Sequence, residues 1–145
     1  MPIIRLHETV PFTPQQMYDL VVDVPRYPEF LPWCVATRVW DHEEHSFLAE
    51  MTVAFKGIRE KFQTRDELVP GRAVKVTLHA GPFHHLVNDW RFQAVPGGAS
   101  VDFFIDFKFK NRLMDLTLGP FFSRASAEML AAFKQRAYQL HPIAS

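Results

Sequence analysis

The chain has 145 residues, its 16 lysines and arginines balance 16 aspartates and glutamates, and 48% of its residues are hydrophobic. This hydrophobic content with zero formal net charge excludes a disordered chain, and no apolar run approaches the ~18 residues that span a bilayer. Cys34 is the only cysteine, so neither an intramolecular disulfide nor a cysteine-rich metal site is expected. The balanced charge gives no overall attraction for DNA. At this length we expect one domain over residues 1–145.

The first elements predicted are a strand and a capped helix. Residues 3–10 alternate between apolar and polar, which indicates a strand. Thr13 and Gln16 have the spacing of a capping box, so a helix is predicted over residues 14–22. In the proline-punctuated segment that follows, at most one short helix fits, around residues 26–31.

From Trp33 onward the hydrophobic period is two, which is typical of strands with one apolar and one polar face. Short turn signals break this region at four places: Lys56-Gly57, Pro70-Gly71, Gly81-Pro82 and Pro96-Gly97-Gly98. Strands joined by such turns predict an antiparallel meander of about six strands.

The tail from about residue 112 to residue 140 carries an apolar stripe at three- and four-residue spacing, which predicts one long amphipathic helix. Gly119-Pro120 should kink this helix or mark its true start. The order of elements predicts an α+β fold in which the long helix covers one face of a curved antiparallel sheet.

The apolar faces are unusually aromatic, with 14 phenylalanines in the chain. Periodicity alone favours a solid core of large side chains. A single helix over a strongly curved sheet also leaves room for an elongated apolar cavity, the usual form of a small-molecule site. The aromatic positions on these faces are Phe47, Phe55, Phe62, Trp90, Phe92, Phe103, Phe107, Phe121, Phe122 and Phe133.

The segment from Tyr27 to Cys34, YPEFLPWC, combines prolines with large apolar side chains. Such a rigid elbow suits the rim of a pocket or a surface that touches lipid, and a well-packed corner between helix and sheet is the alternative. Phe83, which follows Gly81-Pro82, is predicted to be a similar rim residue on an opposing loop.

Two polar side chains, Glu60 and Asn88, fall in register with the apolar face. An inward polar group must be paired or lie near an open end, since burial without a partner is costly. Each is a candidate for contacting the polar head group of a ligand. Because Glu60 is close to the Lys56-Gly57 turn, the alternative is that it lies near the sheet edge in water.

The remaining patterns contain no catalytic constellation. His42 and His45 lie in a predicted loop and form only a weak metal motif without a nearby third ligand, so no metal is expected. No nucleophile with a base, phosphate loop or dinucleotide fingerprint occurs. Four basic side chains lie along one predicted strand and form a basic patch: Lys56, Arg59, Lys61 and Arg65. This patch suits phospholipid head groups or RNA. The alternative is that it only keeps the sheet soluble, since lysines on strands oppose aggregation.

These residues together resemble the coenzyme Q-binding, START-like family. Beyond the segment from Tyr27 to Cys34, the matching motifs run in order through nearly the whole chain. They are Ala49-Glu50-Met51, Phe55-Lys56-Gly57, Phe62-x-Thr64-Arg65, Gly81-Pro82-Phe83, Trp90-x-Phe92, Asp106-Phe107-x-Phe109, Gly119-Pro120 and Ala132-Phe133-x-x-Arg136-Ala137.

The resemblance implies a helix-grip fold with a hydrophobic tunnel that binds ubiquinone as a ligand, without a cofactor and without catalysis, in support of respiratory electron transfer. We expect the quinone to contact residues of the elbow, the sheet and the helix: Tyr27, Phe30, Leu31, Trp33, Met51, Val53, Phe55, Phe62, Phe83, Trp90, Phe103, Phe122 and Met129. The elbow and Phe83 would form the mouth of the tunnel.

The family leaves two other functions open. Its bacterial members are named as ribosome association toxins, which implies the large ribosomal subunit as an alternative partner of the basic patch. Related START-like folds include cyclases and dehydratases, for which Glu60 would be the acid or base. Mitochondrial members carry a targeting extension that this sequence does not show, so we expect a bacterial cytoplasmic protein that visits the inner membrane.

Overall fold

The computed structural model describes residues 2–142. Seven strands form one antiparallel sheet in the order β1-β7-β6-β5-β4-β3-β2. The elements are β1 (Ile3–Val10), α1 (Pro14–Val22), the 3-10 helix η1 (Val24–Glu29), β2 (Cys34–Glu43), β3 (Ser46–Phe55), β4 (Ile58–Val69), β5 (Ala73–Ala80), β6 (Phe83–Val95), β7 (Gly98–Phe109), α2 (Arg112–Thr117), α3 (Gly119–Ala127) and α4 (Met129–Leu140).

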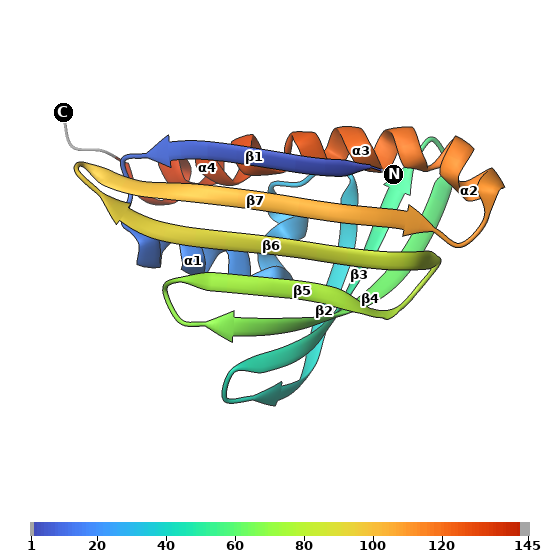
Figure 1. Ribbon diagram of the computed structural model, residues 1–145, viewed down its shortest axis with the longest axis horizontal. Coiled ribbons are helices and arrows are strands. Elements are labelled where there is room, and N and C mark those ends of the chain that lie inside the picture. Colours follow the sequence, from blue (N-terminus) through green and yellow to red (C-terminus); the bar gives the residue numbers. More distant parts are fainter. Residues whose placement is uncertain (1, 143–145) are drawn as a thin grey trace.

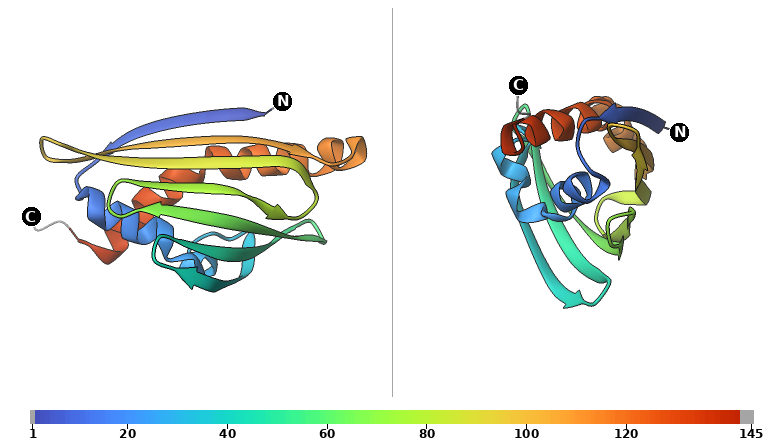
Figure 2. Two further views of the ribbon diagram at one scale, coloured as in Figure 1. Left: turned by 60° about the horizontal axis from the view of Figure 1, so that its bottom comes forward. Right: turned by 90° about the vertical axis from the view of Figure 1, so that its left-hand side faces the viewer.

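The sheet bends around the C-terminal helices. Strands β2 to β7 follow one another as the predicted meander, and β1 returns to pair with β7 at the far edge. Figure 1 shows α3 and α4 along one side of the sheet, and Figure 2 shows the sheet wrapping around them. The predicted α+β architecture with a helix gripped by a curved sheet is confirmed.

The first helix begins and ends where the sequence predicts. The Thr13 side chain accepts a hydrogen bond from the backbone of Gln16, and the Gln16 side chain accepts one from the backbone of Thr13. The next helix starts earlier than predicted, at Val24 rather than near Arg26, and is a 3-10 helix. Pro28 lies inside it, and a proline cannot donate the bond that an α-helix requires there.

The tail forms three helices instead of one. The break before α3 lies at the predicted Gly119-Pro120, where the missing N–H of Pro120 falls in the first turn of the helix. A second break, at Glu128 between α3 and α4, was not predicted. No glycine or proline marks it, and the Glu128 N–H still bonds to the Arg124 carbonyl oxygen at 3.1 Å.

Two groups of aromatic side chains form solid parts of the core. Phe133 of α4 packs edge-on against Tyr27, Phe30 and Trp90, with ring centroids 5.0–5.3 Å away. Phe83, with an exposed fraction of 2%, lies among rings of β4, β7 and α3. The predicted placement of Phe83 on a loop at a pocket rim is therefore wrong, because β6 begins at this residue and turns its ring inward.

Candidate functional site

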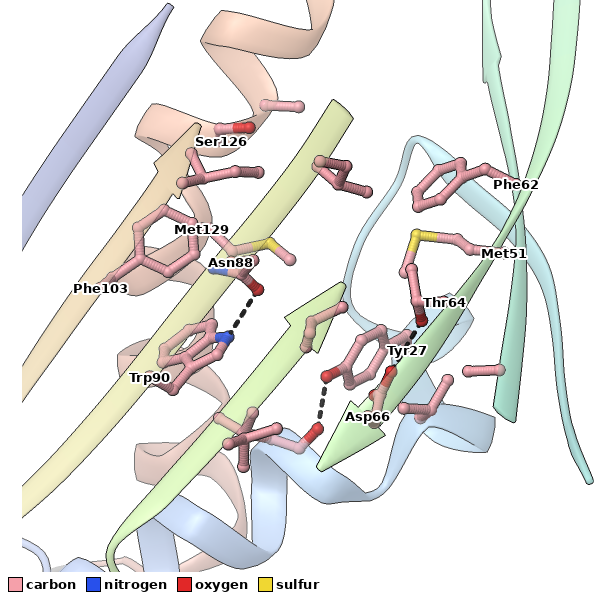
Figure 3. Close-up of a pocket in the computed structure, with 18 of the residues that line it drawn as sticks. Tyr27, Met51, Phe62, Thr64, Asp66, Asn88, Trp90, Phe103, Ser126 and Met129 are labelled. Atoms are coloured by element: carbon pink, nitrogen blue, oxygen red, sulfur yellow. Dashed lines mark hydrogen bonds between the residues drawn. The ribbon is translucent and has the colours of Figure 1, made fainter. Parts of the chain in front are cut away.

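A cavity of about 80 Å³ lies between the concave face of the sheet and helices α3 and α4 (Figure 3). The N-terminal helices α1 and η1 close it from one side through Val21, Val24 and Tyr27. Small-molecule sites typically measure ~300–1,000 Å³, so the walls must move apart before a larger ligand fits. The other lining residues are Trp33, Ala49, Met51, Phe62, Thr64, Asp66, Val74, Val76, Leu86, Asn88, Trp90, Phe103, Ile105, Phe121, Phe122, Ala125, Ser126 and Met129.

Much of the predicted ligand-contacting set meets at this cavity. The residues come from η1, the start of β2, the sheet and the C-terminal helices, which are far apart in the sequence. They are Tyr27, Trp33, Met51, Phe62, Asn88, Trp90, Phe103, Phe122 and Met129.

The other predicted residues lie elsewhere. Val53, Glu60 and Phe83 line a separate void of about 10 Å³ between β4 and α3. Phe55 stacks on Phe121 with ring centroids 4.4 Å apart, at the end of β3. Leu31 is buried with an exposed fraction of 1%, so it does not form a mouth.

One part of the segment from Tyr27 to Cys34 packs in the core, and another part lines the cavity. Phe30 packs on Phe133 at 5.0 Å and lies under the guanidinium of Arg136 at 5.2 Å. Tyr27 and Trp33 reach the cavity, and Trp33 is half-buried. One part of the segment is thus the packed corner of the alternative prediction, and Tyr27 and Trp33 form part of the cavity wall.

Asp66 places a buried carboxyl group on the cavity wall, and it was not predicted from the sequence. The alternation Ile58, Glu60, Phe62, Thr64 on β4 reaches Asp66 one step further on. Its side chain is 5% exposed and accepts a hydrogen bond from the Thr64 hydroxyl at 2.7 Å. Burial raises its pKa from 3.8 to about 6, and the bond from Thr64 opposes that rise. The inward carboxyl group of the main cavity is therefore Asp66, not Glu60.

The other polar groups on the wall bond to the protein itself. Asn88 donates to the Phe104 carbonyl oxygen at 2.8 Å and accepts from the Trp90 indole N–H at 3.1 Å. The Tyr27 hydroxyl donates to the Val21 carbonyl oxygen. Burial raises the pKa of Tyr27 well above its usual range, and the nearby Asp66 raises it further, so this phenol stays protonated. Ser126 of α3 adds a buried hydroxyl that the sequence reading did not identify.

The predicted basic patch lies outside the cavity. Lys56, Arg59 and Lys61 are exposed, and Arg65 is half-buried. An acidic side chain, Glu50, lies beside the patch and offsets part of its positive charge. Glu50 accepts hydrogen bonds from Arg38 and Gln63, both at 3.0 Å, and these bonds, with Lys61 nearby, lower the pKa of Glu50.

Three further features concern metal ligands, the cysteine and the length of the helices. Over residues 2–142, no three His, Cys, Asp or Glu side chains gather as metal ligands. Cys34 is buried, which raises the pKa of its thiol to about 11, so the thiolate needed for reactivity is scarce at neutral pH. None of the described helices is long and apolar enough to cross a bilayer.

The fold and the cavity define a START-like protein, in which a curved sheet and a C-terminal helix enclose apolar space. The chain belongs to the polyketide cyclase/dehydrase and lipid transport family, whose model matches residues 10–134. A START superfamily protein from Mycobacterium smegmatis has the same fold, with a TM-score of 0.70 over 95% of this chain and 98% of that one, at 16% identity.

Two relatives carry names that point to different functions. The ribosome association toxin RatA of Pseudomonas aeruginosa is 41% identical over 91% of this chain and 92% of its own length. The mitochondrial coenzyme Q-binding protein COQ10 homolog B of Xenopus laevis is 30% identical over 90% of this chain and 55% of its own length. The predicted family membership is confirmed.

Proposed function

We propose that this protein binds a polyprenyl quinone such as ubiquinone in the cavity and does so without catalysis. The observation that carries the proposal is an apolar cavity with only a few polar groups, enclosed by a sheet and two jointed helices. Such a site suits a ligand with a compact polar head and a long apolar tail. The name of the Xenopus relative supports the same ligand class.

Entry of the ligand requires the cavity to expand, and its walls are suited to that. Met51 and Met129 have unbranched side chains that repack easily, and both are half-buried. Met129 directly follows the break at Glu128, so a small rotation between α3 and α4 would widen the cavity. The prenyl tail would then lie along Met51, Phe62, Phe103 and Met129, and burial would contribute about 25 cal/mol per Å² of apolar surface.

Extraction of the purified protein followed by mass spectrometry of its lipids tests the proposal. A co-purifying quinone, or uptake of ubiquinone from vesicles, supports it. Recovery of the added quinone with unchanged mass and unchanged chromatographic retention distinguishes binding from a dehydratase reaction, which would change the mass, and from a cyclase reaction, which would change the retention. A lipid-free protein that also fails to take up quinone contradicts the proposal.

A matched pair of variants ties uptake to this cavity. Ala125 lines the cavity and is buried, whereas Ala127 on the same helix is exposed. Ala125→Leu fills part of the 80 Å³ and should lower quinone uptake at least tenfold, while Ala127→Leu should leave it unchanged. Equal uptake by both variants would place the ligand elsewhere.

Ribosome association is the second candidate, and the name of the Pseudomonas relative favours it. The exposed basic side chains on and beside β4 are the surface we propose for contact with the large subunit.

Changing Lys56, Arg59, Lys61 and Arg65 together to Gln should abolish co-sedimentation with ribosomes. The control changes Lys108, Lys110 and Arg112, three exposed basic residues that lie outside this patch. Unchanged binding and salt dependence in the first variant would exclude the patch as the contact.

We also propose that the carrier meets the membrane at the end of the molecule that contains α2. Leu113 and Leu116 are exposed by 70% and 67%, and Ile58, after the β3–β4 turn, by 41%. Figure 2 shows α2 and this turn at the same end. Lys56 lies two residues before Ile58 in the chain, and Lys110 and Arg112 lie just before Leu113, and all three are exposed. Exposed apolar side chains with basic neighbours are the combination that suits an anionic lipid surface.

A further inference from the structure

The carboxyl group of Asp66 is an unusual feature for a cavity that is otherwise apolar. It is 95% buried, and among residues 2–142 the Thr64 hydroxyl supplies its one side-chain hydrogen bond. None of the described residues that line the cavity carries a positive charge. A buried carboxylate with one hydrogen bond and no cation retains acceptor capacity that a ligand can satisfy.

The hydrogen-bond donors on the wall are largely engaged already. The hydroxyl of Tyr27 donates to Val21, and the indole N–H of Trp90 donates to Asn88. The Ser126 hydroxyl both donates and accepts, so it does not distinguish one kind of ligand from another. The wall therefore offers an acceptor at Asp66 and few free donors, the reverse of what the carbonyl oxygens of a quinone need.

We propose that Asp66 makes the cavity select a head group that donates a hydrogen bond, so that a hydroquinone or phenol is preferred to a quinone or ether. This inference rests on the proposed binding of a quinone-type ligand. A hydroxyl on the ligand would give the carboxylate a charge-assisted hydrogen bond. An acceptor-only head group would exclude water from the carboxylate without replacing the lost hydrogen bonds.

The preference depends on pH through the protonation of Asp66, whose pKa lies at about 6. Above that pH the carboxylate accepts from a hydroxyl, and below it the protonated group donates to a carbonyl or ether oxygen as well. Its register partners on β3 and β5, Phe47 and Val76, do not titrate.

We expect the charge of Asp66, rather than that of its titratable neighbours, to change in this pH range. From η1, Tyr27 faces Asp66, and its raised pKa keeps it neutral. Behind Tyr27 lie Cys34 of β2, a neutral thiol, and Asp23 at the end of α1, which pairs with Arg26 at 3.2 Å. The lining residues of β6, α3 and α4 contribute no titratable side chain among the described residues.

Two redox-inert probes test the selectivity: 4-decylphenol and its methyl ether, 4-decylanisole. Binding to the full chain is followed by the fluorescence of its 3 tryptophans at pH 5 and pH 8. The wild-type protein should bind the phenol at least about tenfold more tightly than the ether at pH 8, since a hydrogen bond to a charged group contributes at least that much. The ratio should fall several-fold at pH 5.

Asp66→Asn is the first variant, and its ratio should be small and independent of pH. Thr64→Val is the second variant. It removes the hydrogen bond that stabilises the ionised carboxylate of Asp66, so the pH midpoint of the preference should move upward. If the Asn variant fails to fold, the midpoint in the Thr64→Val variant decides the matter. A wild-type ratio that does not change with pH, or an unchanged ratio in Asp66→Asn, overturns the role of Asp66 alone. Failure of both probes to bind at either pH overturns the proposed function together with this inference.

Discussion

Asp66 shows how one residue can link stability and ligand choice. Most of the polar groups on the cavity wall bond to backbone or to each other, so their cost of burial is met within the protein. Within the described part of the chain, the Asp66 carboxyl group has only the Thr64 hydroxyl as a side-chain partner, and burial raises its pKa because keeping a charge there costs free energy. A residue that is destabilising when ionised, and that faces a cavity, is a reasonable place to expect a ligand.

This burial predicts a pH dependence of stability. Below about pH 3.8 Asp66 binds a proton in both the folded and the unfolded state, and between there and about pH 6 only the folded state keeps it. The contribution of Asp66 to the free energy of unfolding therefore falls as pH rises through this window, by up to about 3 kcal/mol, and is constant above it. Asp66→Asn should remove this fall.

Urea denaturation of the wild type and the variant at intervals between pH 4 and pH 7 measures the effect. The difference in unfolding free energy between the two proteins should change across the window in favour of the variant. Glu67→Gln, an exposed neighbour on the same strand, is the control and should show no such change. A constant difference between wild type and Asp66→Asn would mean that the carboxyl group is solvated in the folded state.

At the scale of elements, local sequence signals specify where most helices and strands begin and end. The capping box of Thr13, the alternation along the strands and the Gly119-Pro120 break all lie within a few residues of the features they determine. The break at Glu128 has no such signal. We attribute it to packing, because α3 and α4 must follow a sheet whose curvature a straight helix cannot match.

Two glycines give a test of how closely the elements pack. A methyl group on Gly98, the first residue of β7, would lie 1.8 Å from the Val10 carbonyl oxygen, whereas one on Gly119 would have no atom within 4 Å. Gly98→Ala should lower the free energy of unfolding by roughly 1–3 kcal/mol, since the β1–β7 edge must shift. Gly119→Ala should leave it unchanged or raise it by up to about 1 kcal/mol, because alanine favours the helix.

Chemical denaturation of both variants measures these changes. The far-UV spectrum should stay the same, which shows that the fold is retained. A neutral Gly98→Ala would mean that the turn before β7 adjusts freely and that the edge of the sheet is not packed as described.

At the scale of the whole molecule, the fold separates three surfaces. The cavity lies inside the curve of the sheet, and the basic patch lies outside the cavity, at the β3–β4 turn and on β4. The exposed leucines belong to α2, which lies at one end of the molecule in Figure 1. The cavity shares no residue with the other two surfaces, and Lys56 is the residue that the basic patch and the membrane surface have in common. Quinone binding, ribosome binding and membrane contact can therefore be altered separately by mutations at residues other than Lys56.

The membrane contact can be measured with vesicles that contain about one-third anionic lipid. Leu113→Asp with Leu116→Asp replaces the two most exposed large apolar side chains of residues 2–142 by charges that anionic lipid repels, so co-flotation should fall at least tenfold. Val69→Asp, at a residue exposed by 51% outside α2, is the control and should float as the wild type does. Equal flotation of all three proteins would assign lipid contact to another surface.

The sequence by itself determined the meander of strands, the first helix, the start of α3 and the aromatic composition of the inner face, because these follow from alternation, capping and turn residues. It also predicted many of the cavity residues through the family motifs.

Only the tertiary structure decided which inward side chains pack solidly and which border empty space. Phe133 and Leu31 are solid core, whereas Trp33 and Met129 reach the cavity. The depth of Asp66 depends on strand curvature and on helices distant in the chain. Alternation states which face a residue takes, but burial and ionisation depend on what the rest of the fold brings against that face.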